Sequence, residues 1–505
     1  MRVALASTAL ERLPVDALAV PVAAGEPLTG AAAELDQRLG GLLSEMTSAE
    51  HRGAIDEVLT LPTGGAVEAP RVLLYGLGKT EDLDGQRLRY AHHQMARRAS
   101  RYGYRRLAVV CSQPLQSEHL AAVVEGSLMG SWDRRRRQTG EHSAELEELL
   151  LSGFGDGGEV DLAASQQLAQ ATNRVREWQN LPPNELTPEA LTRIARQIGE
   201  RHGLEVDVLG PEELQAGAFE LLLGVGAGSD LAPRLVRLQH RGALIGGGRA
   251  DVRLALVGKG VTFDSGGLSI KTAEQMRTMK GDMAGAAAVL AAVDVIAARR
   301  LPLDVMAVVA ITENMVGGSA QRPGDIVTSA NGKTVEVVNT DAEGRLILAD
   351  AITYAVQKGA THIVDIATLT GAANVALGHA ATLAVANDEE LWGWTAEAAE
   401  RSGERVWRMP MYPDYEVLLA SRVADLKNSF YGEAGAIAAG MFIREFVEGR
   451  PWVHLDIAAS SWNTNEGLTS IPRGPLGTGT RLLVHLAELV ASGHPVQPSS
   501  DGTFS

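Results

Sequence analysis

Residues 339–346 read Asn-Thr-Asp-Ala-Glu-Gly-Arg-Leu and follow a short apolar alternation that ends at Val338. Asp341 and Glu343 stand two residues apart, and alternate side chains of an extended segment project to the same face. Arg345 follows two residues later. The stretch therefore predicts two hard oxygen ligands and a fixed cation on one side of a strand end. Two acids at this spacing are common, so the prediction depends on other acidic segments joining them.

Two upstream segments carry the same residue types. Residues 257–271 contain Lys259, Asp264 and Lys271, and Asp282 follows within the sequence Met-Lys-Gly-Asp-Met. Together with residues 339–346 they supply four carboxylates, two lysines and an arginine, a set that is typical of hydrolases with two metal ions. The alternative for Asp264 alone is a surface turn, because the sequence Asp-Ser-Gly-Gly is also favourable in turns.

Charge repulsion favours the metal site once the four acids are considered together. Carboxylates that crowd one another repel strongly unless cations neutralise them. Two divalent metal ions about 3.5 to 4 Å apart would do so, and they would activate a water molecule as a nucleophile. Carboxylate-rich sites accept zinc, manganese, magnesium or cobalt, so the sequence does not identify the metal.

The rest of the chain alternates strand-like apolar runs with helical segments, which predicts an α/β protein whose sheets are covered by helices. The expected strands are 17–20, 71–75, 107–111, 254–257, 305–311, 335–338, 362–366 and 453–457. The expected helices include 31–43, 86–101, 119–128, 284–299 and 346–357. The acidic residues then fall near strand ends, where α/β sheets place their ligands.

The length of the chain predicts two domains, because 505 residues exceed what one hydrophobic core usually supports. Pro182 and Pro183 stop a helical segment, and Thr187 with Pro188 is a favourable start for the next helix. We expect an N-terminal α/β domain at residues 1–160, a connecting helix at 161–186, a C-terminal domain at 187–492 and a flexible tail at 493–505.

Charge and composition narrow the classes of function. The formal net charge of −16 opposes non-specific binding to nucleic acid, and we interpret the one dense basic run, Arg134–Arg137, as a solvated surface. The single cysteine, Cys111, excludes an internal disulfide framework and suits a reducing compartment. Glu11 and Arg12 interrupt the apolar N-terminus, and no apolar run reaches the roughly 20 residues that span a bilayer. We expect a cytoplasmic protein with no membrane partner.

Two glycine-rich stretches resemble nucleotide-binding motifs but lack the required context. Residues 224–229 have no β-branched strand before them and no acidic partner after them, which disfavours a dinucleotide site. A phosphate-binding loop needs Ser or Thr directly after its lysine, whereas Gly260 follows Lys259. No nucleotide cofactor is therefore predicted.

Residues 257–271, 279–283 and 339–346 resemble the corresponding segments of the cytosolic leucyl aminopeptidase family. The resemblance continues through Ala-Thr-Leu-Thr-Gly-Ala at 367–372 and His-Leu-Asp-Ile-Ala at 454–458. It implies a macro-like α/β N-terminal domain and a C-terminal α/β catalytic domain with a mixed central sheet covered by helices. It also implies a metal-dependent aminopeptidase, a hydrolase of intracellular peptide turnover.

The resemblance further implies a ligand set for two divalent metal ions, manganese or zinc. One ion would be held by Asp264, Asp341 and Glu343, and the other by Lys259, Asp264, Asp282 and Glu343. A lysine ligand must bind as the neutral amine, and a nearby dication lowers its pKa by charge repulsion. The alternative for Lys259 is a protonated counter-ion, and the sequence does not separate the two.

Catalytic and substrate-binding roles also follow from the resemblance. Lys271 would polarise the scissile carbonyl as an ammonium, and Arg345 would hold a bicarbonate ion that shuttles protons. The substrate-binding residues would be Met279, Asn339, Thr368 and Gly371, in an apolar pocket that suits leucine or methionine at the free N-terminus of a short peptide. The family also implies a homo-hexamer.

Two other functions remain as alternatives. Some members of the family double as DNA-binding proteins, but the net charge of −16 and the isolated arginine run oppose this function. A catalytically inactive homologue is disfavoured because every expected ligand and both catalytic cations are present.

Overall fold

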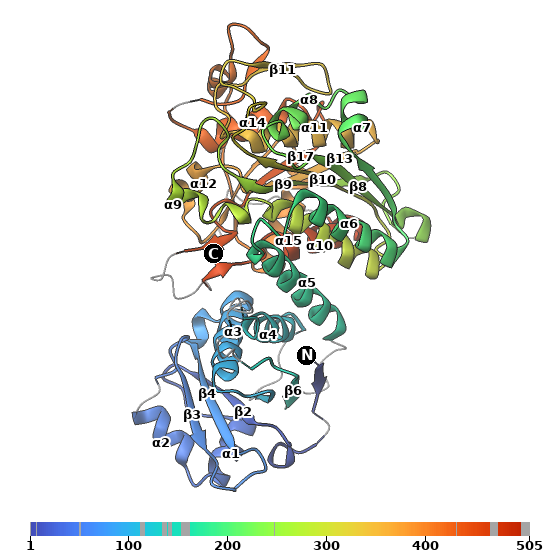
Figure 1. Cartoon of the computed structure of the whole chain (residues 1–505). Helices are drawn as coiled ribbons and strands as arrows, with labels where there is room; N and C mark the ends of the chain where they lie inside the picture. The colour runs from blue at the N-terminus through green and yellow to red at the C-terminus, as the bar shows by residue number, and fades with distance from the viewer. Residues whose placement is uncertain are drawn as a thin grey trace. The chain divides into compact units, whose positions relative to one another are not determined.

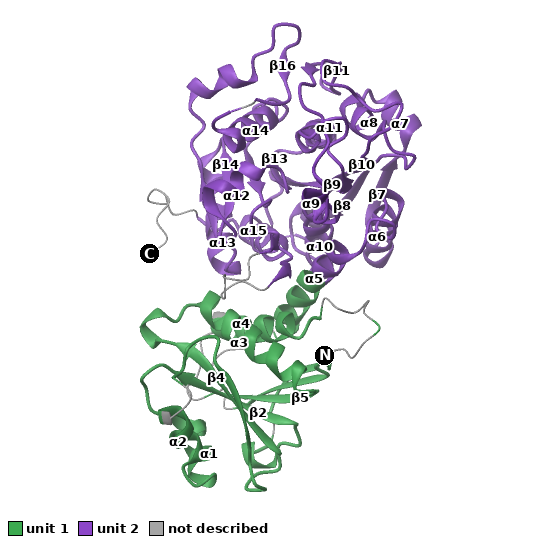
Figure 2. Cartoon of the chain, turned by 60° about the vertical axis from the view of Figure 1, so that its left-hand side comes forward, with its two compact units in different colours: residues 1–173, 467–471 green, residues 174–466, 472–505 purple. Residues whose placement is uncertain are grey.

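The computed structural model describes residues 2–6, 8–49, 52–111, 117–133, 139, 144–152, 162–246, 248–430, 432–464 and 473–495. The Arg134–Arg137 run and residues 496–505 of the expected tail lie outside them. The chain divides into two compact units, residues 1–173 with 467–471 and residues 174–466 with 472–505 (Figures 1 and 2).

The first unit contains, among its described residues, a six-stranded sheet in the order β1-β6-β5-β2-β4-β3. Neighbouring strands are parallel except β3 with β4. The strands are β1 (Arg2–Leu5), β2 (Ala17–Ala23), β3 (Val58–Pro62), β4 (Arg71–Gly78), β5 (Arg106–Val110) and β6 (Glu148–Ser152). Alternate residues of β2 pack into two separate hydrophobic cores, so both faces of the sheet are covered.

The helices of this unit are α1 (Gly30–Arg38), α2 (Leu42–Ala49), α3 (Gly85–Arg101), α4 (Ser117–Gly130) and most of α5 (Leu162–Asn180). The single helix expected over residues 31–43 is wrong. Gly40 and Gly41 adopt φ values of +70° and +87° and end α1 there. The Asp36 carboxylate then accepts a hydrogen bond of 2.7 Å from the backbone N–H of Leu43, near the start of α2.

The second unit contains, in the part of the chain that the structure describes, an eight-stranded mixed sheet in the order β15-β14-β17-β13-β9-β10-β8-β7. Its four central strands, β17, β13, β9 and β10, are mutually parallel. The strands are β7 (Glu205–Leu209), β8 (Arg234–Arg241), β9 (Arg253–Asp264), β10 (Asp304–Asn314), β13 (His362–Ala367), β14 (Thr382–Ala386), β15 (Val406–Arg408) and β17 (Trp452–Asp456). The expected mixed sheet is confirmed, and β9 runs seven residues beyond the predicted end at Val257.

Helices cover both faces of this sheet, with α6, α10 and α15 on one side and α8, α11 and α14 on the other (Figure 1). The helices are α6 (Pro188–His202), α7 (Pro211–Ala216), α8 (Glu220–Gly226), α9 (Ala273–Met276), α10 (Ala284–Ala298), α11 (Glu343–Gln357), α12 (Gly371–Leu377), α13 (Glu389–Ser402), α14 (Gly435–Arg444) and α15 (Thr480–Ser492). Small sheets join β11 (Ile326–Thr328), β12 (Thr334–Glu336) and β16 (Leu426–Lys427), and β18 (Trp462–Asn463) with β19 (Gly474–Pro475). Thr187 caps α6 as predicted, because its hydroxyl accepts a hydrogen bond from Ala190 N–H.

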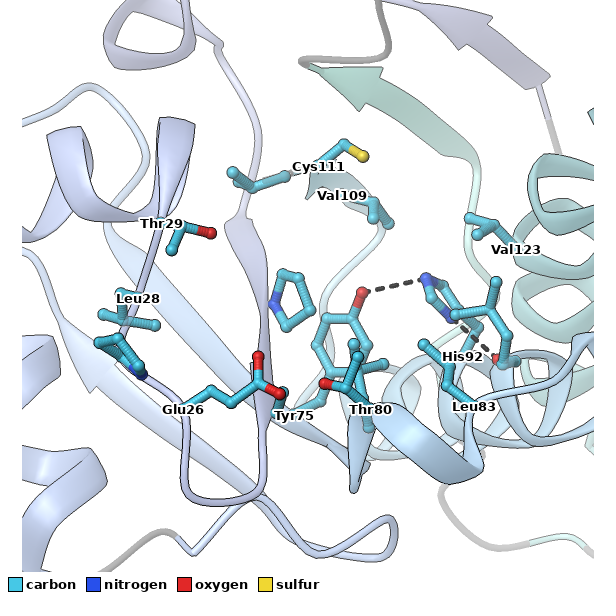
Figure 3. Close-up of a pocket in the computed structure, with 16 residues that line it drawn as sticks. Glu26, Leu28, Thr29, Tyr75, Thr80, Leu83, His92, Val109, Cys111 and Val123 are labelled. Atoms are coloured by element: carbon cyan, nitrogen blue, oxygen red, sulfur yellow. Dashed lines mark hydrogen bonds between the residues drawn. The ribbon is translucent and has the colours of Figure 1, made fainter. Parts of the chain in front are cut away.

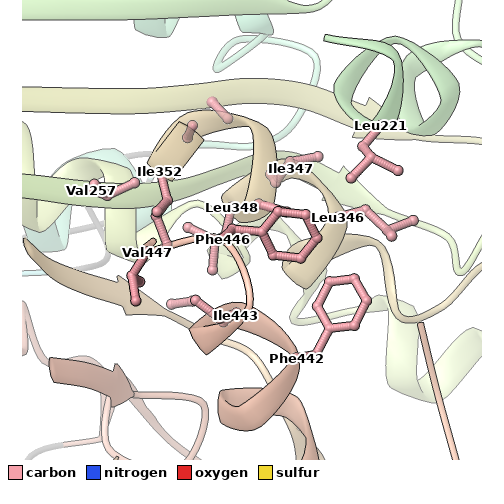
Figure 4. Packing of buried hydrophobic residues seen from close by; sticks show 14 of the residues in the cluster. Leu221, Val257, Leu346, Ile347, Leu348, Ile352, Phe442, Ile443, Phe446 and Val447 are labelled. Atoms are coloured by element: carbon pink, nitrogen blue, oxygen red, sulfur yellow. The ribbon is translucent and has the colours of Figure 1, made fainter. Parts of the chain in front are cut away.

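The core on the α11 side fixes that helix against the sheet. Figure 4 shows Leu346 and Ile352 of α11 in the same cluster as Val257 of β9 and Phe442 of α14. All of these side chains are fully buried. Because the first residues of α11 belong to the predicted metal site, this packing also holds the acidic end of the helix in place.

The α10 side is packed so closely that only glycine fits at its contacts. Residues 279–298 are long and apolar enough to cross a membrane by length and composition, but 94% of an 18-residue apolar window within them is buried in the protein. A Cβ atom at Gly285 would lie 2.1 Å from the carbonyl oxygen of Ile366 in β13. At Gly258 of β9, a Cβ atom would lie 2.7 Å from the Cα atom of Ala286.

We predict that Gly285→Ala lowers the free energy of unfolding by about 2 kcal/mol. Overpacking against a buried backbone costs up to roughly 3 kcal/mol, which exceeds the gain of about 1 kcal/mol in helix propensity. The measurement is the urea midpoint of the full-length protein. Gly318→Ala is the matched control, because nothing lies within 4 Å of its new Cβ atom. Equal midpoints for the two variants would contradict the close approach of α10 to the sheet.

Candidate metal centre

The predicted ligands meet at the carboxyl ends of the central strands. Lys259 and Asp264 lie on β9, and Asp282 follows the 3-10 helix η4 (Met279–Gly281) just before α10. The expectation that Asp341 and Glu343 lie on one extended segment is wrong. Asp341 lies in a turn and Glu343 is the first residue of α11.

Three carboxylates form one half of the centre. Oxygen atoms of Asp264, Asp341 and Glu343 lie within 4.8 Å of one another. Lys271 contacts two of them, with its Nζ atom 2.6 Å from Asp264 Oδ2 and in contact with Asp341 Oδ1. Asp264 and Glu343 are buried, whereas the Asp341 side chain is 32% exposed. This half of the centre therefore reaches the surface.

Lys259 forms the other half of the centre between two acids. Its Nζ atom lies 2.9 Å from Asp282 Oδ1 and 2.8 Å from Glu343 Oε1. It also donates a hydrogen bond of 2.7 Å to the carbonyl oxygen of Thr368. A Cβ atom at Gly344 would lie 2.8 Å from this Nζ atom, so the glycine after Glu343 leaves the space that the lysine occupies.

Burial and crowding shift the protonation of these groups. Burial raises the pKa of Asp282 to about 8, and Glu343 and Asp264 add to the rise against the opposing effect of Lys259. Burial likewise raises the pKa of Asp341 to about 6, although Lys271 opposes it. For Lys259, burial lowers the pKa but the surrounding carboxylates outweigh it, and the pKa lies above the usual value. Asp282 and Asp341 thus resist ionisation, chiefly because they are buried, and Lys259 holds its proton because carboxylates surround it.

The donor set fits divalent metal ions. Four carboxylates offer hard oxygen ligands of the kind that manganese and zinc accept. Asp282 Oδ2 is buried and has no hydrogen-bond partner among the described residues. A buried carboxylate oxygen without a partner is costly, and a metal ion would satisfy it.

Arg345 lies on the first turn of α11, where the negative charges of Glu343 and Asp456 partly offset the lowering of its pKa by burial. Its Nη1 atom donates a hydrogen bond of 2.7 Å to the carbonyl oxygen of Asn428. Its Nε–H is buried and finds no partner in the described part of the chain. Burial lowers the pKa of Arg345 to about 10, so it remains a cation at neutral pH.

Two of the four predicted substrate-binding residues, Met279 and Asn339, lie on segments that carry ligands, and the other two, Thr368 and Gly371, lie between β13 and the start of α12. Thr368 follows β13, and its hydroxyl donates a hydrogen bond of 2.7 Å to Asp282 Oδ1. Met279 begins η4, three residues before Asp282, and Gly371 begins α12 with nothing within 4 Å of a Cβ atom placed there. Asn339 Oδ1 accepts a hydrogen bond of 2.9 Å from Asp341 N–H. Thr368 and Asn339 therefore also orient acids of the centre.

Two asparagines hold the acidic segments in place by hydrogen bonds. Neither of them was identified from the sequence as a residue of the site. Asn314 ends β10 beside Asp264, and its amide donates hydrogen bonds of 2.8 Å to Asp264 Oδ1 and 3.0 Å to the Thr340 carbonyl. Asn428 Nδ2 donates a hydrogen bond of 2.7 Å to the Asn339 carbonyl, and its side-chain oxygen accepts from Val338 N–H. Isolated asparagines give no signal in a sequence, although the β9–β10 pairing would have brought Asn314 to Asp264.

Comparison with known proteins agrees with this geometry. The catalytic domain of the cytosol aminopeptidase family matches residues 173–484, and the N-terminal domain of that family matches residues 19–140. A probable cytosol aminopeptidase of Alkaliphilus metalliredigens is 42% identical over 467 residues, 90% of this chain and 92% of that protein. A probable cytosol aminopeptidase of Alkaliphilus oremlandii is 39% identical over 501 residues, 97% of this chain and 99% of that protein.

Two solved structures share the fold of the chain. A variant of tomato leucine aminopeptidase has a TM-score of 0.86 and 33% identity, and the match covers 96% of each chain. A bottromycin maturation enzyme in complex with manganese has a TM-score of 0.82 and 31% identity, over 94% of this chain and 99% of that chain. Since the family match spans more than half of the sequence and these relatives match along nearly their whole length, the chain belongs to the cytosol aminopeptidase family and is a metal-dependent aminopeptidase.

Proposed function

We propose that this aminopeptidase uses two divalent metal ions, manganese or zinc, to release leucine, methionine or another apolar residue from the free N-terminus of short peptides. The observation that carries the proposal is the position of Glu343. Its carboxylate belongs to the Asp264–Asp341 half of the centre and also contacts Lys259, which contacts Asp282. A carboxylate common to both halves is suited to bridge two metal ions.

In this proposal one metal ion would be held by Asp264, Asp341 and Glu343, and the other by Lys259, Asp264, Asp282 and Glu343. When bound, the ions supply a Lewis acid for the scissile carbonyl and a water nucleophile at neutral pH. The manganese in the bottromycin maturation enzyme supports the choice of metal by analogy. Lys259 would have to bind as a neutral amine, and the alternative role as a protonated counter-ion stays open.

Lys271 is proposed to act on the charge that develops during the reaction. Without metal ions, burial lowers the pKa of Lys271, but Asp264, Glu343 and Asp341 outweigh this effect and raise it above the usual value. In this proposal Lys271 has the role of an ammonium. Its side chain is 13% exposed, on the side of the centre that reaches the surface. A fixed ammonium at that position stabilises an oxyanion more strongly than it stabilises the neutral carbonyl.

Arg345 is proposed to bind bicarbonate, which would accept and return protons. Its unpartnered, buried Nε–H supports this role, because a buried guanidinium N–H without an acceptor favours a small anion. The apolar side chain of Met279 and the open space at Gly371 support an apolar first residue. A free α-amine could replace water on the metal ion held partly by Lys259 and Asp282, so only an unblocked N-terminus would bind.

We predict that removal of the metal abolishes hydrolysis of leucine amide and that manganese or zinc restores it. Asp282→Asn should lose bound metal and activity together, because Asp282 is a proposed ligand. Asp230→Asn is the control, since Asp230 is exposed and lies outside the centre. The measurement is turnover together with metal content per subunit. Full activity of verified metal-free protein would sink the proposal, and so would hydrolysis of an N-acetylated peptide.

We predict that Lys271 and Arg345 fail differently. Loss of a group that stabilises the oxyanion costs about a hundred- to a thousand-fold in turnover, so Lys271→Ala should be nearly inactive. Arg345→Ala should keep more activity, because water or another anion can partly replace a proton shuttle, and it should lose stimulation by added bicarbonate. Both variants should keep their metals. An Arg345→Ala variant that responds to bicarbonate as the wild type does would refute the assignment.

We further propose a cytoplasmic homo-hexamer, by analogy with the family. Static light scattering should give six times the chain mass of 53.4 kDa at micromolar concentration. A mass of one chain across the same range would rule the hexamer out. The assembly is expected to restrict access to short peptides, so an extended peptide and a folded protein with the same N-terminal leucine should be cleaved at very different rates.

A further inference from the structure

The first unit contains a pocket that the aminopeptidase reaction does not use. It has a volume of about 180 Å³. It lies at the carboxyl ends of the neighbouring parallel strands β5, β2 and β4, where Val110, Ala23 and Leu77 line it (Figure 3). After β2 the chain continues toward β4, and after β5 it continues toward β6 on the opposite side. Such a reversal is where open α/β sheets bind their ligands.

The volume and the lining residues of the pocket determine the size and polarity of a ligand that could fill it. An apolar cavity of about 150 Å³ is large enough to hold benzene. Most of the lining side chains are apolar, among them Leu28, Leu83, Leu88 and Val123. A single aromatic ring, or a branched chain of the same size, therefore fits.

Tyr75 and His92 together leave a hydrogen-bond acceptor in the pocket. His92 Nδ1 lies 3.0 Å from the Leu88 carbonyl, which can only accept, so this nitrogen carries a proton. Burial lowers the pKa of His92 to about 4, and the ring is neutral at pH 7. The hydroxyl of Tyr75 then donates to His92 Nε2 over 3.0 Å and leaves its own oxygen as an acceptor.

Glu26 supplies the formal charge of the pocket. Figure 3 shows its carboxylate at the side of the pocket, directed toward Tyr75. No lysine or arginine is among the described residues that line the pocket. The start of α1 at Gly30 lies next to the lining residue Thr29, but a helix end carries only about half a positive charge. The full charge on Glu26 exceeds it, so phosphates and other anions are disfavoured.

We propose that this pocket binds a small apolar amine, with one ring or an equivalent branched chain between the strand ends and its ammonium group at Glu26. The Tyr75 oxygen accepts a second hydrogen bond from the ligand. The site is independent of the metal centre, because every residue that defines it belongs to the first unit. Its ligand is an amine and not a nucleotide.

The test uses three probes with the same ring, benzylamine, benzyl alcohol and phenyl phosphate. Titration calorimetry is performed on the metal-loaded, full-length protein, and the variants below separate binding in this pocket from binding at the metal centre. We expect benzylamine to bind more tightly than benzyl alcohol and phenyl phosphate not to bind. Tighter binding of phenyl phosphate than of benzylamine would overturn the proposal.

Two variants locate the binding. Glu26→Gln should weaken benzylamine about fivefold, the effect of a partly exposed ion pair, and leave benzyl alcohol unchanged. Glu34→Gln is the matched control, because Glu34 is an exposed acid of the adjacent helix α1 that does not line the pocket. Ala23→Leu should fill the pocket and abolish binding of both probes. Wild-type affinity for benzylamine in Glu26→Gln, or in a folded Ala23→Leu protein, would refute the site.

Discussion

The metal centre of the second unit holds more carboxylates than lysines. Asp264, Asp282 and Glu343 are buried, Asp341 is half-buried, and only Lys259 and Lys271 contact them among the cations of the described residues. Two like unit charges 4 Å apart repel each other by about 4 kcal/mol near a protein surface. Repulsion among these carboxylates therefore destabilises the folded state when no metal ion is bound. Burial raises the pKa of Asp282 and of Asp341, and the neighbouring carboxylates raise both further. Metal binding and stability are therefore coupled at this site.

The fold holds the cluster together with contacts that allow little adjustment. Asn314 and Asn428 fix the backbone and carboxylates of the acidic segments by hydrogen bonds. Gly344 leaves space for Lys259, and Gly285 lets α10 approach the sheet beside it. The positions of the ligand side chains therefore depend on how closely the backbone segments that carry them pack together.

The strands and helices of the centre were predictable because their apolar runs are long and regular. β9, β10 and β13 all appear where alternation or apolar runs indicated them. β8 was missed because Arg237, Gln239 and His240 interrupt its apolar pattern, although these side chains are buried in the structure. The turn at Asp341 was missed for a different reason: a D-x-E pair fits both a strand and a helix start, and only tertiary contacts decide between them.

The two candidate sites use carboxylates in opposite ways. The acids of the metal centre are buried and crowded, so they need cations whose charge and geometry match, and the site is selective for metal ions. Glu26 stands alone and exposed at the edge of an apolar pocket, where water already solvates it. Its ion pair with an amine therefore adds little affinity, and the apolar pocket must supply most of the binding free energy. The pocket of the first unit is accordingly suited to a ligand that binds weakly and exchanges quickly, whereas the buried acids of the metal centre are suited to tight binding of a cation.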